Sequence, residues 1–370
     1  MTPFGFSPEE LRRTVRAFLE KKSPEEQVRR LMETTEGYDR VVWEQLAGQL
    51  GLVGLAIPEQ FGGSGFTFLE LMVVLEEMGR RLLCAPYFAT AVLAANALLQ
   101  SGDTAAAQAW LPGIASGETV ATLALAEASG RWDEAGIAAT ASPSNGGWTI
   151  RGTKCYVLDG HIADLVLVAA RTSAGVSLFA VPDKAPGLAR TLLRTLDPTR
   201  RQARITFADT PATLVGEDGQ GWAVIERVLE LAAVALAAEQ VGGAQFVLDM
   251  AVQYAKDRFQ FGRPIGSFQA IKHKCAEMLL EVESARSAAY YAGWCAADGT
   301  EELTQAAALA KAYCSEAYFR VAAENIQVHG GIGFTWEHPA HLYFKRAKSS
   351  ELLFGDPSYW RELLLHRQGL

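Results

Sequence analysis

Residues 254–271 read YAKDRFQFGRPIGSFQAI. A helical segment ends here in an arginine, an amide, an aromatic residue and a glycine, and Gly/Pro turns then lead into another helix. An arginine at such an end can hold a pyrophosphate through paired charge-assisted hydrogen bonds, and the neighbouring aromatic ring offers a flat surface for a heterocycle. A helix C-terminus with a solvated arginine explains the same residues, so chemistry alone leaves both interpretations open.

A second segment, residues 325–339, reads NIQVHGGIGFTWEHP and closes another long helix on two glycines. Because Gly330 and Gly331 lack Cβ atoms, a ligand or a second chain can approach their backbone closely. Gln327, one turn earlier, can read an adenine or phosphate edge. An ordinary glycine cap at a helix end is the alternative interpretation.

The sequence predicts neither a metal site nor a disulfide. The five cysteines include no Cys-x-x-Cys pair, and an odd number of them fits a reducing cytoplasm. His338 and His341 lie beside Glu337, but Pro339 breaks the helix that would align the two imidazoles. The N-terminus has no apolar core typical of a signal peptide, so we expect a cytoplasmic protein.

Composition excludes several classes of protein. The chain has 370 residues, and its 34 Lys and Arg against 42 Asp and Glu give a net charge of −8, which disfavours nucleic acid as a partner. Hydrophobic residues make up 49% of the chain, which is typical of a folded globular protein. The uncharged stretch 82–102 contains Pro86 and Asn96, so we expect a buried helix hairpin there and no membrane span.

Hydrophobic periodicity divides the chain into three parts. Residues 1–118 are predicted to be helical, because capping-box patterns begin at Ser7, Ser23 and Thr67. Residues 119–216 alternate with a period of two and predict a β-domain, either a barrel or a sandwich. Residues 217–370 return to the helical period and predict an antiparallel bundle. The long helices are expected at residues 222–256, 269–297 and 304–329.

Residues 52–65 read LVGLAIPEQFGGSG and contain a Pro-Glu-x-x-Gly-Gly-x-Gly pattern. Together with segments 254–271 and 325–339, they resemble the signature regions of the flavin-dependent acyl-CoA dehydrogenase family, collinearly over nearly the whole chain. The resemblance implies an α+β multidomain fold with an N-terminal all-α domain (1–118), a middle β-barrel (119–216) and a C-terminal four-helix bundle (217–370). It also implies α,β-desaturation of an acyl-CoA thioester with FAD as cofactor.

In this family, FAD lies between the β-domain of one subunit and the C-terminal bundle of its neighbour. By resemblance, Arg258, Gln260 and Phe261 would contact the pyrophosphate and adenosine. The residues that complete the adenine side would be Gln269, Gln327, Gly330 and Gly331. All seven residues are present, so the half of the site that a chain lends to its partner is intact.

The half of the FAD site that lies in a chain's own β-domain differs here in sequence from the family pattern. The usual Thr-Glu-Pro-Gly-Ala-Gly-Ser-Asp is AEASGRWD at residues 126–133, and Ala126 and Leu158 replace two hydroxyl side chains that contact the flavin. The α-proton of the substrate must be taken by a carboxylate, but the two positions that usually carry it are Phe354 and Ala232. Glu230, Glu239 and Glu351 are nearby carboxylates; Glu239 is the candidate for a displaced base, and a buried structural acid is its alternative role.

These features favour one subunit of a heteromeric acyl-CoA dehydrogenase. They resemble the base-lacking subunit of actinobacterial α2β2 enzymes that act in steroid side-chain degradation. The homologous partner would supply the base and the flavin pocket, and an electron-transfer flavoprotein or similar acceptor would take the electrons. A self-sufficient homo-oligomeric dehydrogenase using Glu239 and a non-catalytic protein-binding scaffold are the two alternatives.

Overall fold

The computed structural model describes residues 7–144 and 146–369. These residues form two compact units. We call residues 7–28, 68–83 and 233–369 the helical unit, and residues 29–67 and 84–232 the barrel unit. The predicted N-terminal helical segment, residues 1–118, therefore contributes to both units.

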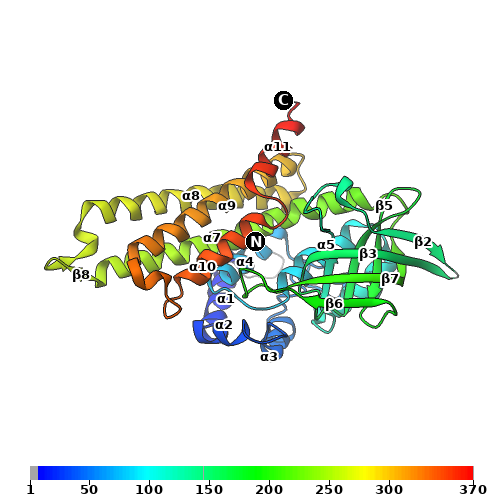
Figure 1. Ribbon diagram of the computed structural model, residues 1–370, viewed down its shortest axis with the longest axis horizontal. Coiled ribbons are helices and arrows are strands. Elements are labelled where there is room, and N and C mark those ends of the chain that lie inside the picture. The colour runs from blue at the N-terminus through cyan, green and yellow to red at the C-terminus, as the bar shows by residue number, and fades with distance from the viewer. Residues whose placement is uncertain (1–6, 145, 370) are drawn as a thin grey trace. The chain divides into compact units, whose positions relative to one another are not determined.

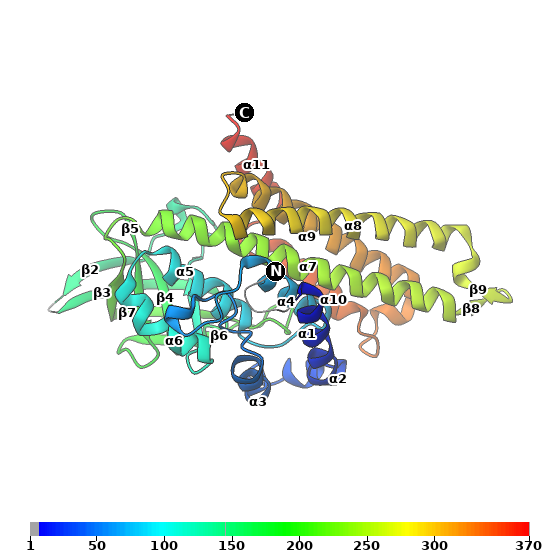
Figure 2. The same ribbon diagram turned by 180° about the vertical axis from the view of Figure 1, so that it is seen from behind.

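Three long helices form the core of the helical unit. They are α7 (Gly221–Asp257), whose first residues belong to the barrel unit, α8 (Gln269–Asp298) and α9 (Leu303–His329), and α8 and α9 run side by side in both Figure 1 and Figure 2. Each predicted long helix is confirmed to within one residue at both ends. The other elements of this unit are α1 (Pro8–Lys22), α4 (Phe68–Arg80), β8 (Phe259–Gln260), β9 (Arg263–Pro264), η5 (Ile265–Ser267), η6 (Gly330–Phe334), α10 (Ala340–Leu352) and α11 (Pro357–Arg367); α2 (Glu25–Leu31) spans the boundary between the units.

Local sequence signals set the beginning of α1. Ser7 Oγ accepts a hydrogen bond from Glu10 N at 3.2 Å, and Ser7 N donates to Glu10 Oε2 at 2.9 Å. The predicted capping box is therefore confirmed, and it satisfies two backbone donors that the helix leaves unpaired. Val15 and Leu19, one turn apart, form the fully buried side of the helix.

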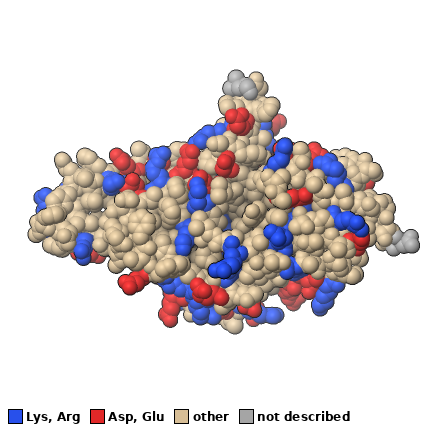
Figure 3. Space-filling view, viewed as in Figure 1, with Lys and Arg blue, Asp and Glu red and all other residues tan. Residues whose placement is uncertain are grey.

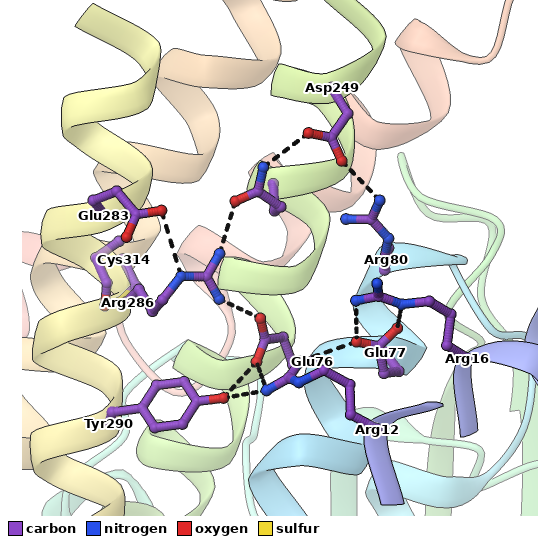
Figure 4. A network of polar contacts seen from close by, with 12 residues as sticks. Arg12, Arg16, Glu76, Glu77, Arg80, Asp249, Glu283, Arg286, Tyr290 and Cys314 are labelled. Atoms are coloured by element: carbon purple, nitrogen blue, oxygen red, sulfur yellow. Dashed lines mark hydrogen bonds and ion pairs between the residues drawn. The ribbon is translucent and has the colours of Figure 1, made fainter. Parts of the chain in front are cut away.

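Charged side chains hold α1 and α8 to α4 (Figure 4). Glu77 of α4 is 1% exposed and accepts two hydrogen bonds from Arg16, both at 2.8 Å, and one from Arg12 at 3.0 Å. Its neighbour Glu76 accepts from Arg286 of α8 and pairs with Arg12 at 2.9 Å. Burial is the largest single influence and raises the pKa of Glu76, but the charges of Arg12 and Arg286 and the hydrogen bonds from Tyr290 and Arg12 together hold that pKa below its ordinary value. The Glu76 carboxylate is thus kept charged inside the unit.

The barrel unit contains one mixed sheet of seven strands. Strands β2, β3, β7, β5 and β4 pair in that order, and β4 pairs again with β2, so the circuit closes and the β-domain is a barrel. Its core includes Ile150, Phe179 and Phe207. The strands are β1 (Ala121–Ala124), β2 (Thr140–Ser144), β3 (Gly147–Leu158), β4 (Leu165–Arg171), β5 (Val176–Pro182), β6 (Leu188–Leu192) and β7 (Gln202–Val215).

Helical segments before the sheet complete the barrel unit. The predicted hairpin between residues 82 and 102 is wrong, because residues 88–100 form one continuous helical segment, a π-helical η3 followed by α5. No glycine or proline lies between residues 87 and 101 to interrupt it. Among the described helices, none is long and apolar enough to cross a bilayer. The segments are α3 (Arg40–Glu44), η1 (Gln45–Gln49), η2 (Glu59–Phe61), η3 (Phe88–Ala94), α5 (Ala95–Gln100), α6 (Thr104–Ser116) and, within the sheet, η4 (Glu134–Gly136).

Candidate functional site

The segment 254–271 forms a hairpin at the end of α7. Arg258 N donates to Tyr254 O at 2.8 Å as the helix ends, and β8 then pairs with β9 through Gln260 and Arg263. Phe261 and Gly262 make the two-residue turn with φ of 54° and 78°, a left-handed pair of the kind that tight hairpins require. Figure 1 shows the hairpin extending beyond the ends of α7 and α8.

The hairpin presents its predicted cofactor-binding residues to the outside of the unit. Phe261 is 92% exposed, and Arg258 and Gln260 are exposed beside it. Positive φ is an unfavourable backbone conformation for a large aromatic residue. Because the Phe261 ring is exposed, burial within this unit does little to offset that cost. The end of the bundle that carries the hairpin in Figure 1 is covered mainly by uncharged groups in Figure 3. This surface is suited to contact a group outside the unit.

The second predicted segment, residues 325–339, also has backbone with free space around it. α9 ends at His329, and Gly330 follows with φ of 65°, a conformation that favours glycine. A Cβ atom added at Gly330 or Gly331 would meet nothing within 4 Å. Gln327 is exposed one turn earlier, and Gln269 is exposed at the first position of α8. All seven residues predicted to contact FAD lie in the helical unit.

Aromatic rings join the two predicted segments. The ring of Tyr254, one turn before Arg258, lies 4.2 Å from the ring of His329, which directly precedes Gly330. His338 lies two residues before the start of α10, and its ring is 4.3 Å from the ring of His329. Over residues 7–144 and 146–369, no group of three His, Cys, Asp or Glu side chains has a geometry that could hold a metal ion.

Neither position at which the sequence analysis places the family's base carries a proton acceptor. Phe354 is 4% exposed and has φ of 62°, and its carbonyl accepts a hydrogen bond from Trp360 Nε1 at 3.0 Å. Ala232 is fully buried within α7. Glu351 pairs with Lys348 at 2.9 Å, and Glu230 with Arg227 at 3.2 Å.

Glu239, the candidate displaced base, lies in a buried ion pair. Its Oε1 accepts a hydrogen bond from Arg346 of α10 at 2.8 Å, and the two side chains are 8% and 4% exposed. A guanidinium at this distance forms a charge-assisted hydrogen bond that engages the carboxylate. The contact therefore favours a structural role for Glu239, which was the alternative to catalysis.

Sequence reasoning missed a buried lysine that holds the loop after α10. Lys311 is fully buried in α9, and its Nζ donates to the carbonyls of Ser350, Glu351 and Gly355 at 3.0–3.2 Å. A cation is well placed at the C-terminal end of a helix, where unpaired carbonyls and the helix dipole are negative. The available signal was a lysine inside an alanine-rich, otherwise apolar stretch of α9. Its bonds fix the loop that contains Phe354.

In the barrel unit, the positions that usually carry flavin-contacting hydroxyls are buried and aliphatic. Ala126 is 4% exposed and Leu158 2% exposed. The adjacent Glu127 is well anchored, because its Oε1 accepts from Lys154 Nζ at 2.6 Å and from two backbone amides. Burial lowers the pKa of Lys154 to about 8, while the charge of Glu127 opposes this shift. This pair, which the sequence analysis did not identify, ties residue 127 to residues 138, 139 and 154, although Ala126 and Leu158 carry no hydroxyl.

Comparison with known proteins identifies the family. Family models for the acyl-CoA dehydrogenase N-terminal, middle and C-terminal domains match residues 7–118, 122–210 and 219–368. The chain belongs to the acyl-CoA dehydrogenase family. Members of this family are FAD flavoproteins, so this acyl-CoA dehydrogenase is an oxidoreductase that acts on acyl-CoA with FAD as cofactor.

Several relatives of this acyl-CoA dehydrogenase are bacterial. Acyl-CoA dehydrogenase IpdE2 of Mycolicibacterium smegmatis is 38% identical over 94% of this chain and 94% of the relative. A variant of the Tcur3481–Tcur3483 steroid ACAD has 33% identity, a TM-score of 0.89 and 98% coverage of both chains. The ChsE4–ChsE5 complex from Mycobacterium tuberculosis has 30% identity, a TM-score of 0.90, and coverage of 98% of this chain and 97% of the other.

The residues of the helical unit fit FAD chemically. Arg258 supplies an exposed cation for a pyrophosphate, and Phe261 supplies an exposed ring for a heterocycle. The open backbone at Gly330 and Gly331 admits a close approach. When bound, FAD accepts a hydride equivalent from the β-carbon of the thioester.

Proposed function

We propose that this chain is one subunit of a heteromeric, FAD-dependent acyl-CoA dehydrogenase. Its hairpin and Gly330–Gly331 segment contact the adenosine and pyrophosphate of an FAD whose flavin ring lies in a homologous partner subunit. The partner supplies the carboxylate that removes the α-proton. The proposed substrate is a steroid side-chain or other bulky acyl-CoA, and an electron-transfer flavoprotein or similar acceptor takes the electrons.

One contrast supports this proposal. The segments that serve a neighbour's cofactor are complete and exposed, with Phe261 92% exposed, whereas Phe354 and Ala232 occupy the usual base positions. A hydrocarbon side chain cannot take a proton at any pH. The similarity to the ChsE4–ChsE5 complex and the Tcur3481–Tcur3483 steroid ACAD, both with two named components, is consistent with a two-chain enzyme.

The proposal is tested by expressing this chain alone and with the homologous subunit encoded beside it. We expect the chain alone to bind little FAD and to be inactive, and the purified complex to contain FAD and reduce a dye acceptor. Stoichiometric FAD and full activity in the chain alone would instead indicate a self-sufficient enzyme. A stable complex without FAD or activity would indicate a scaffold.

Within that complex, Arg258→Met should weaken FAD binding about tenfold to a hundredfold, since a charge-assisted hydrogen bond contributes about 1.5–3 kcal/mol. Titration of the apo-complex with FAD, followed by flavin fluorescence, measures the change. Lys256→Met is the matched control, because it removes an equal charge from an exposed position two residues earlier. Equal FAD affinity in Arg258→Met and the parent complex would contradict the proposed contact.

A further inference from the structure

One face of α8 carries a stripe of exposed side chains. Buried side chains that include Val282, Ala285 and Ala289 hold the opposite face to the rest of the helical unit, and α8 lies along the edge of that unit in both Figure 1 and Figure 2. The exposed residues follow one another at intervals of three or four, so they share one side of the helix. They are His273, Ala276, Leu280, Glu283, Ser287, Tyr291, Trp294 and Asp298.

Large apolar side chains are prominent in this stripe. Leu280 is 68% exposed, Tyr291 47% and Trp294 45%, and the neighbouring Leu279 is 49% exposed. The ring centroids of Tyr291 and Trp294 lie 6.2 Å apart, so the two rings form one surface. Side chains of this kind are stabilised when they are removed from water, and apolar patches on a folded surface mark sites of contact with another protein.

The stripe complements itself when a second copy of α8 runs antiparallel to the first, with Ser287 at the twofold axis. Residues that lie equally far before and after Ser287 then face each other across the contact. Leu280 and Trp294, seven residues on either side, form an apolar pair. Glu283 and Tyr291, four residues on either side, pair a carboxylate with a hydroxyl donor. The small side chain of Ser287 allows the two helices to approach closely at the centre.

The charges at the two ends of α8 are complementary in the same arrangement. Lys272 is exposed near the beginning of the helix, whereas Asp298 is exposed at its end and Glu301 and Glu302 are exposed in the turn that follows. Lys272 lies fifteen residues before the axis and Glu302 fifteen residues after it. Antiparallel pairing therefore brings the basic end of each copy beside the acidic end of the other, whereas parallel pairing would place like charges together.

We propose that α8 forms a contact between two copies of this chain, paired antiparallel about Ser287. A second copy is the occupant because a twofold contact requires a surface that complements itself, as this stripe does in shape and in charge. In the heteromeric enzyme proposed above, the contact joins two pairs of subunits into an assembly with two copies of each. The inference goes beyond that proposal and does not rest on it, since its residues are not among those assigned to FAD.

Analytical ultracentrifugation of the full chain, alone and with the homologous subunit encoded beside it, tests the contact. We expect a dimer of the chain alone and a complex with two copies of each subunit. Leu280→Asp places a carboxylate against Trp294 of the second copy, so it should weaken self-association at least tenfold and leave one copy of each subunit in the complex. Leu196→Asp is the matched control, because Leu196 is 58% exposed in the barrel unit and its replacement should keep the parent assembly.

An exchange of charges tests the direction of the pairing. Lys272→Glu places an acid beside the acidic end of the second copy, so it should weaken the dimer by up to about fivefold. Adding Glu302→Lys should restore the parent affinity, because opposite charges then face each other again. Both effects should diminish at high salt, which screens exposed charges.

A thiol placed on the axis gives an independent readout. In Ser287→Cys the two thiols adjoin, so a short thiol-to-thiol crosslinker should join the two copies covalently. Ala276→Cys is the matched control on the same stripe, because the two thiols would lie about 33 Å apart along the paired helices. It should therefore give no more crosslinked dimer than the parent chain.

A monomeric parent chain together with a complex of one copy of each subunit would overturn the inference. So would an assembly that Leu280→Asp leaves unchanged, or equal crosslinking in Ser287→Cys and Ala276→Cys. Release of the homologous subunit by Leu280→Asp would show that α8 binds that partner, which also overturns the self-contact. None of these measurements depends on FAD or turnover, so they are separate from the test of the proposed function. If no complex forms, the proposed function fails, and the size and crosslinking of the chain alone still decide this inference.

Discussion

Replacing Arg346 by methionine should destabilise the helical unit by about 3–5 kcal/mol, because it removes the guanidinium from a buried carboxylate. The Arg346 Nη1–Glu239 Oε1 distance is 2.8 Å, and neither side chain is more than 8% exposed. Water cannot replace the lost cation efficiently at that depth. Denaturant unfolding at pH 7, monitored by circular dichroism, measures the change in the free energy of unfolding.

Two further variants distinguish destabilisation by a buried charge from destabilisation by a general loss of packing. Adding Glu239→Gln to Arg346→Met should recover most of the lost stability, since the buried carboxylate that lost its guanidinium is then replaced by a neutral amide. Arg40→Met, which breaks an exposed pair with Glu44, should change stability by less than about 0.5 kcal/mol. A loss below about 1 kcal/mol in Arg346→Met, or no recovery in the double variant, would contradict the buried pair.

The single variant Glu239→Gln tests whether the carboxylate of this ion pair acts as the catalytic base. If Glu239 is structural, this variant should keep both FAD and turnover in the active assembly. Abolished turnover with FAD still bound would instead support a self-sufficient enzyme that uses Glu239 as its base. Steady-state kinetics together with the FAD content of the same preparation distinguish these outcomes.

Gly242→Ala should prevent α4 and α7 from packing and cost at least about 3 kcal/mol, enough to remove most folded protein. A Cβ atom at position 242 would lie 1.8 Å from Glu76 O, and one at Gly79 would lie 2.0 Å from Glu239 O. Both clashes are with backbone atoms, which cannot rotate away as a side chain can. Separation of the helices would also displace Glu76 from Arg286 (Figure 4).

Gly48→Ala is the control for Gly242→Ala. Gly48 is an exposed residue of η1, and an added Cβ atom would meet nothing within 4 Å. It should therefore be neutral or stabilising by up to about 1 kcal/mol, because alanine loses less backbone entropy on folding. Soluble yield and thermal melting of both variants measure the contrast. A parental melting temperature in Gly242→Ala would contradict the close approach.

Local patterns predicted most of the elements. Short runs of β-branched or aromatic residues at 165–168, 176–181 and 204–207 predicted β4, β5 and β7, and helical periodicity predicted α7, α8 and α9. The uncharged stretch 82–102 was misjudged, because hydrophobicity alone does not say whether a helix turns back. The exposed hairpin was also predictable, since Phe261 and Gly262 form a tight turn through neighbouring residues.

The sequence by itself determined the family and predicted which segments contact FAD, and it shows that residues 354 and 232 are Phe and Ala, because these conclusions depend on residue type at positions set by local motifs. Only the tertiary structure decided the pairing of Glu239 with Arg346, 107 residues apart, the capping of α10 by Lys311, and the contact between the rings of His338 and His329. A side chain's type shows what it can bind. Its actual partner depends on which distant segments the packed core brings within hydrogen-bond distance.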